Sequence, residues 1–442
     1  MSHRRIWKRL LAAFGGLLLA WLLIALFFDP GPVDDSDLAL PERKVDPAQN
    51  PYPEIRDFSL SEEGVKEIGR LDSMVEGEEV FEEAFVQSVL ERNAEVLERF
   101  ERYAAMRDWW QDEPVGSNMD FNYLFGWIRL AILKRAESIW LASRGEREAA
   151  IESAVSVLKF AAGLRASGGP LLTALMADSI SGIGAKGVAR LLQHHEFTGD
   201  ELACLAAKLD DPVFSRNDLE SVLRTEYAFI AATAMDRATF ERVVRPTLSE
   251  TPAWLPLPLA YKSNRTRSML GDFYRAAVRA SDGDCRSFIA EIDGAIPLGQ
   301  WAKWSNVLTG NAIGFELCSL GNEPSKGAFQ RSFAVQAQHS LLRVFVAMKR
   351  YRLDHGERPA TLDLLVPAYL EAVPTDPMDG MPLRYNAKYR IVYSVGEDFT
   401  DDGGFSPDRR GAFESRQEIS IELEPSDSAS RPGLPEKKAA GD

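Results

Sequence analysis

The sequence predicts a mainly α-helical protein with an N-terminal transmembrane helix, a solenoid-like body of antiparallel helices and a small C-terminal α+β lobe. Three observations predict this class. An uncharged apolar run extends from Leu10 to Phe28, apolar residues recur at helical spacing from Ser59 to about Leu320, and an alternating segment covers 389–396. Helical spacing indicates a helix with one buried face, whereas strict alternation indicates a strand.

The N-terminal run has the length and the flanking charges of a membrane anchor. Its 19 uncharged residues approach the roughly 20 that a helix needs to cross a bilayer core. The positive-inside rule places the N-terminus in the cytoplasm and the body outside, as in a single-pass protein of the bacterial inner membrane with a periplasmic body. A cleaved signal peptide is the alternative, but the run ends without the small residues that cleavage requires. The flanking residues are Arg4, Arg5, Lys8 and Arg9 before the run, and Asp29, Asp34, Asp35 and Asp37 after it.

Charge and cysteine content bound the function further. The formal net charge is -15, which argues against a nucleic-acid partner, since phosphate binding needs a basic face. The three cysteines Cys204, Cys285 and Cys318 match no zinc spacing. In an exported domain one disulfide could form and leave one thiol over, and three buried small side chains are the alternative.

Composition divides the chain into five segments. Within the helical body, Tyr123–Ala142 and Glu146–Ala166 are expected to form an antiparallel helical hairpin. The turn Ala142-Ser-Arg-Gly-Glu-Arg-Glu-Ala-Ala-Ile151 resembles that of tetratricopeptide-like repeats, but no fixed 34-residue period follows it. The segments are a cytoplasmic tip and anchor (1–28), an extended linker rich in Pro and Asp (29–57), the helical body (58–330), the α+β lobe (331–413) and a disordered tail (414–442).

The lobe carries a series of short motifs in a fixed order. They are Tyr351-Arg-Leu-Asp-His-Gly356, Pro374-Thr-Asp-Pro377, Gly380-Met-Pro-Leu-Arg-Tyr385 and Tyr393-Ser-Val-Gly-Glu-Asp398. With the helix before them, they resemble the C-terminal half of the major pseudopilins of type II secretion over Leu342–Phe413. The resemblance implies a small antiparallel sheet on a helix and a calcium-binding loop. The implied ligands are Asp398, Asp401 and Asp402, with Asp408 a weaker candidate.

The chemistry of this loop leaves two interpretations open. Calcium takes six to eight oxygen ligands from carboxylates, carbonyls and water, and Gly403 and Gly404 permit a tight turn around an ion. Aspartate and glycine are equally typical of a hydrated turn.

A glycine motif in the body, Gly182-Ile-Gly-Ala-Lys-Gly187, matches the G-x-G-x-x-G spacing of dinucleotide-binding loops. Such a site needs a strand before the first glycine, and here the preceding residues have helical spacing. We therefore expect these glycines to serve close helix packing.

The sequence shows no nucleophile–base motif, which favours an interaction or scaffold protein over an enzyme. The expected partners are the membrane and other envelope proteins, and the resemblance links the protein to secretion. The alternative is an envelope hydrolase whose site assembles from distant Glu, Asp and His residues of the helical body.

Overall fold

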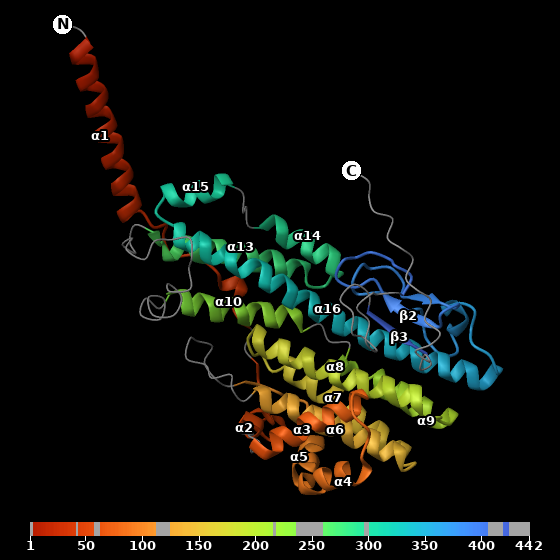
Figure 1. Cartoon of the computed structure of the whole chain (residues 1–442). Coiled ribbons are helices and arrows are strands. Elements are labelled where there is room, and N and C mark those ends of the chain that lie inside the picture. The colour runs from red at the N-terminus through yellow and green to blue at the C-terminus, as the bar shows by residue number, and fades with distance from the viewer. Residues whose placement is uncertain are drawn as a thin grey trace.

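The computed structural model confirms a mainly helical fold with one small antiparallel sheet (Figure 1). It describes residues 3–40, 43–56, 62–111, 124–214, 218–235, 260–295, 300–404 and 419–423. The helices form an elongated body, and the sheet lies at the far end of the longest helix.

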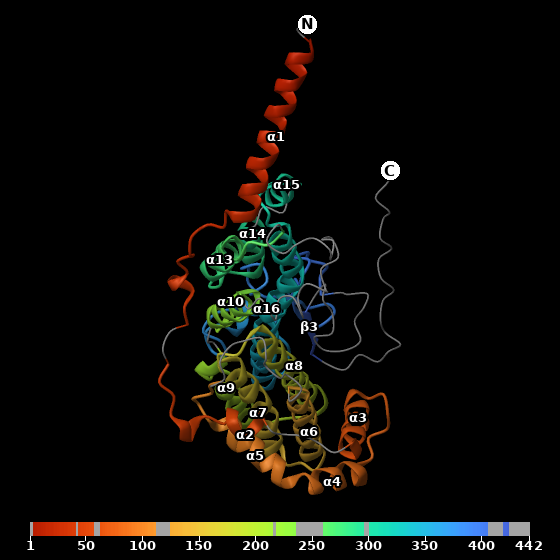
Figure 2. The same cartoon turned by 90° about the vertical axis from the view of Figure 1, so that its left-hand side faces the viewer.

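Helix α1 (His3–Phe27) covers the predicted anchor and projects away from the body (Figures 1 and 2). Its described apolar side chains are exposed, among them Leu10, Phe14 and Leu17. Among the described residues, no helix combines the length and the apolar character needed to cross a bilayer. The structure therefore supports a helix at this position without supporting its prediction as a transmembrane span.

The segment after α1, predicted as an extended linker, is bound along the surface of the body. The Asp29 carboxylate accepts hydrogen bonds from the backbone N–H groups of Asn264 and Arg265. Asp35 pairs with Arg267 at 2.6 Å, and Asp37 pairs with Arg275 at 2.7 Å. These partners lie on α13 (Ser263–Ala280), so α13 sets where α1 leaves the body. The short elements of the linker are η1 (Ser36–Leu38), η2 (Pro47–Gln49) and α2 (Tyr52–Arg56).

The body is built from helices that pack against their sequence neighbours. The predicted hairpin forms α6 (Leu124–Ser143) and α7 (Arg147–Arg165), and Gly145 adopts the left-handed φ of +81° in its turn. Helix α8 (Leu171–His194) packs on both of them. The remaining body helices are α3 (Glu62–Glu76), α4 (Glu83–Arg92), α5 (Ala94–Ala105), α9 (Gly199–Leu209), η3 (Pro212–Phe214), α10 (Leu219–Met235), α14 (Cys285–Ala295) and α15 (Gln300–Leu308).

Two of the three motif glycines on α8 lie in close helix contacts. A Cβ atom on Gly184 would lie 2.9 Å from Leu158 Cδ2, and one on Gly187 would lie 3.2 Å from Arg135 Cγ. Gly182 is different, because its nearest neighbour would be Gln338 Oε1 at 3.9 Å. The motif sits inside a helix without a preceding strand, which agrees with the packing interpretation.

The lobe is joined to the body by one continuous helix, α16 (Ala312–His355), which is 44 residues long. The boundary predicted between residues 330 and 331 therefore falls inside a helix. After the short helix η6 (Leu362–Leu365), strands β1 (Arg384–Asn386), β2 (Ile391–Ser394) and β3 (Ile419–Glu422) form an antiparallel sheet in that order. Strands β2 and β3 contact α16.

Strand β3 corrects the predicted tail, which was expected to be disordered from residue 414. Ile419 and Ile421 are buried, and their partners across the ladder are Ser394 and Val392. The alternating residues of this segment gain a buried environment only when β2 lies beside them. Residues 424–442 of the predicted tail lie outside the described residues.

All three cysteines are free thiols, with Cys285 and Cys318 buried.

Candidate functional site

The predicted metal loop follows strand β2 and folds around the side chain of Asp401. Its Oδ1 atom accepts hydrogen bonds of 3.0 Å from the Tyr393 hydroxyl and the Gly403 backbone N–H, and its Oδ2 atom accepts from Arg384 Nε at 3.2 Å. Asp398 instead accepts from the backbone N–H of Thr400 at 3.1 Å. The loop contains left-handed residues at Phe399, Gly403 and Gly404. Asp408 lies outside the described residues.

Arg384 occupies the centre of a group of three carboxylates at this end of the sheet. Its other two nitrogens donate to Asp376 at 2.8 Å and to Asp379 at 2.5 Å. Burial by itself lowers the pKa of Arg384, but the hydrogen bond and charge of Asp379 outweigh it and raise that pKa. Burial raises the pKa of Asp376. A guanidinium thus supplies the positive charge that these carboxylates require.

The structure does not bring Asp398, Asp401 and Asp402 into one ligand group. Among the described residues, no cluster of three His, Cys, Asp or Glu side chains has the geometry to hold a metal ion. Calcium binding at this loop stays a prediction.

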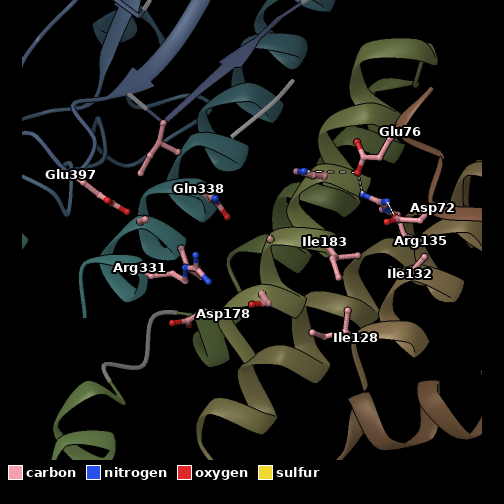
Figure 3. A pocket seen from close by; sticks show the side chains of 16 residues that line it. Asp72, Glu76, Ile128, Ile132, Arg135, Asp178, Ile183, Arg331, Gln338 and Glu397 are labelled. Atoms are coloured by element: carbon pink, nitrogen blue, oxygen red, sulfur yellow. Dashed lines mark hydrogen bonds and ion pairs between the residues drawn. The ribbon is translucent and has the colours of Figure 1, made fainter. Parts of the chain in front are cut away.

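A larger candidate site is the cleft between the helical body and the α16–lobe unit. It encloses about 480 Å³, within the range of small-molecule and peptide sites. Figure 3 shows Arg331, Gln338 and Glu397 on one side and Asp72, Glu76 and Arg135 on the other. Its apolar lining includes Ile128, Ile132, Ile183 and Ile419.

On the body side of the cleft, the charges are paired. Arg135 is 3% exposed and binds Asp72 and Glu76, the latter at 2.7 Å. Burial raises the pKa of Asp72, whereas Arg135 and Lys186 outweigh burial at Glu76 and lower its pKa. At the floor, the buried Asp178 accepts hydrogen bonds from Arg165 and from the Ser332 hydroxyl. These carboxylates are therefore neutralised within the protein.

On the α16 side, two polar groups face the cleft without partners among the described residues. Arg331 is exposed and forms no hydrogen bond or ion pair within that part of the chain. Gln338 Oε1 is buried and accepts no hydrogen bond there. The two residues are seven positions apart on one helix, so they lie on the same face. Figure 3 shows both side chains reaching into the gap.

This arrangement can hold a ligand that carries both an anion and a hydrogen-bond donor. A guanidinium binds carboxylates with two parallel hydrogen bonds, and an amide oxygen accepts from an N–H group. The isoleucines offer an apolar surface next to them. An acidic, partly apolar peptide segment combines these features.

A second cavity, of about 450 Å³, surrounds His339 on the other side of α16. Burial is the main cause that lowers the pKa of His339 to about 4. Its Nε2 atom is buried and has no hydrogen-bond partner among the described residues, so no hydroxyl or thiol of that part of the chain is paired with it. The imidazole is therefore neutral and weakly basic.

Sequence reasoning missed Arg331 and Gln338, although a signal for them exists. Both polar residues lie on the same face of α16 as Ala334 and Val335, between the apolar positions that pack into the core. The only signal is their spacing of seven residues, which places both side chains on one face of the helix. Helix α8 forms the wall opposite Arg331 and Gln338, and the sequence does not indicate that α8 lies there.

Comparison of the chain with protein-family models, curated proteins and solved structures found no match.

Proposed function

We propose that this protein is a scaffold of the bacterial cell envelope, held at the inner membrane by α1, which binds an acidic segment of a partner protein in the cleft. The observation that carries the proposal is the face of α16 with Arg331 and Gln338 directed into a cleft. In that cleft, Asp72, Glu76 and Asp178 are already paired. Such a surface offers charge and hydrogen bonding to a ligand.

Membrane attachment is supported by the character and position of α1. The helix projects from the body, and Phe14 and Leu17 are 67% and 71% exposed. Burying one such side chain in an apolar environment contributes about 1.5–3 kcal/mol. Basic residues at its start and aspartates at its end favour a cytoplasmic N-terminus and a periplasmic body.

A link to secretion is supported by the resemblance of the lobe to type II pseudopilins. The lobe has a small antiparallel sheet whose strands β2 and β3 contact α16. In the proposal, the lobe forms one wall of the cleft through Glu397 and Ile419. The partner would then be another envelope protein of a secretion assembly.

The test is site-specific photo-crosslinking in cells with a benzophenone side chain at position 182, where a side chain would extend into the cleft. The full-length protein is then captured from detergent-solubilised membranes, and the crosslinked peptide is identified. We expect a segment with acidic and apolar residues. Arg331→Gln should reduce its yield severalfold, because the guanidinium that pairs with the acid is lost.

Arg350→Gln is the matched control, since it neutralises another arginine of α16 that contacts Tyr369 instead of the cleft. It should leave the crosslink unchanged. Equal yields from the wild type and Arg331→Gln would contradict the binding proposal. Turnover of an envelope substrate that is lost on His339→Gln would instead favour a hydrolase.

A further inference from the structure

A second exposed apolar surface lies beside α1, on the short helix α15. Trp304, Val307 and Leu308 are 59%, 38% and 55% exposed, and their spacing places them on one helical face. Among the described side chains of α15, the buried one is polar: Asn306 accepts a 3.1 Å hydrogen bond from Arg265 Nε on α13. A helix on a soluble protein turns its apolar face to the core, whereas the three apolar side chains of α15 face outward.

The contact between α15 and α1 shows where the exposed apolar face of α15 lies along the uncharged run Leu10–Phe28. The Trp21 indole N–H donates to the Leu308 carbonyl oxygen at 2.5 Å, and both views show α15 near the end of α1 that joins the body (Figures 1 and 2). Trp21 precedes Phe28, the last residue of the uncharged run, by seven positions. At 1.5 Å per residue this is about 10 Å. Helix α15 is therefore level with the apolar run.

We propose that α15 is an interfacial helix that rests in the lipid surface, with Trp304, Val307 and Leu308 among the headgroups and upper acyl chains. The proposal rests on the attachment of α1 to a membrane. Interfacial helices bury their apolar face about 5–10 Å deep, which fits the depth given by Trp21. Tryptophan is enriched at membrane–water interfaces, and Trp304 lies one turn before Leu308 on the exposed face of α15.

The consequence is a fixed orientation of the body on the membrane. One helix alone would let the body turn about its axis, whereas a second lipid contact removes that freedom. The bonds of Asp29 to the start of α13 and the pair of Asp35 with Arg267 hold α1 against the same helix that holds Asn306. The surface formed by α1 and α15 therefore behaves as one unit.

The test places a bimane fluorophore at single cysteines of the full-length protein in a Cys204→Ala background, since Cys285 and Cys318 are buried. The protein is reconstituted into vesicles of equal parts phosphatidylcholine and phosphatidylglycerol. One sample contains a lipid spin-labelled at the headgroup, and a second contains a lipid spin-labelled deep in the acyl chain. The probe replaces Leu308 on α15, Leu364 on η6 as a matched control with 48% exposure, and Leu18 on α1 with 55% exposure.

We expect the headgroup label to quench most of the emission at position 308, the acyl-chain label to quench most of it at position 18, and neither label to quench at position 364. Trp304→Asp should abolish quenching at 308 and retain it at 18. Quenching at 18 with none at 308 would overturn the role of α15 and leave the membrane attachment standing. Loss of quenching at 18 and 308 together would overturn both.

Discussion

Arg384 illustrates how single residues determine the chemistry of the lobe. Three carboxylates, from Asp376, Asp379 and Asp401, approach its guanidinium within 3.2 Å. Asp376 is fully buried, and a buried carboxylate needs a positive partner. The sequence showed the aspartates of the loop but not that an arginine from the neighbouring strand reaches Asp401.

Calcium binding at the loop can be tested at one residue. If calcium binds through Asp398, then Asp398→Ala should lower the melting temperature more in calcium than in chelator. The lost hydrogen bond from the Thr400 N–H acts in both buffers, whereas the lost ligand matters only with the ion present. For a chain of 442 residues that unfolds as one unit, a shift of about 1 °C corresponds to each kcal/mol of binding free energy. Differential scanning calorimetry in both buffers measures it.

Glu357→Ala, at an exposed carboxylate of the turn after α16, serves as the control for a general charge effect. Equal shifts of the Asp398→Ala variant in calcium and in chelator would show that the loop is a turn without an ion.

In helix α8, one glycine motif serves two purposes: some of its glycines allow close helix packing, and another lines the cleft. Gly184 lets α8 approach Leu158 and Val157 of α7, which are buried. Gly182 lies two residues earlier, on the face that lines the cleft. The sequence predicted close packing for the motif, and this holds for Gly184 and Gly187. It did not distinguish Gly182, because the wall opposite that position comes from α16.

Replacing Gly184 and replacing Gly182 by alanine should have opposite effects on the free energy of unfolding. Gly184→Ala should destabilise the protein by about 1 kcal/mol, since overpacking typically costs 1–3 kcal/mol and exceeds the gain in helix propensity. Gly182→Ala should stabilise it by up to about 1 kcal/mol, because nothing lies within 3.9 Å of the new Cβ. Urea unfolding measures both. Equal effects of the two substitutions would contradict the packing role of Gly184.

At the scale of the whole molecule, body and lobe share one hydrophobic core. That core includes Val155 and Leu192 from the body, Leu341 from α16, and Val392 and Ile421 from the sheet. The cleft therefore lies between the body and the lobe, which are joined along α16. This shared core fixes the position of Arg331 relative to α8.

This shared core predicts that body and lobe unfold together. Leu341→Ala, at a fully buried position of α16, should cost about 2–5 kcal/mol and lower hydrogen-exchange protection in α8 and β2 alike. Mass spectrometry of the exchanging full-length chain measures both regions. The exposed Leu364→Ala should change protection by less than about 0.5 kcal/mol. Loss of protection in only one region would contradict a common core.

The sequence by itself determined the mainly helical class, the α6–α7 hairpin, the helical course of α1 and the strand at 391–394. These features follow from local periodicity and turn chemistry, which each segment carries on its own. The tertiary structure alone decided that α16 joins body and lobe, that Ile419–Glu422 is a strand, that Arg384 holds Asp401, and that Arg331 faces a cleft. Each of these depends on a neighbour distant in sequence, and periodicity along one segment does not identify that neighbour.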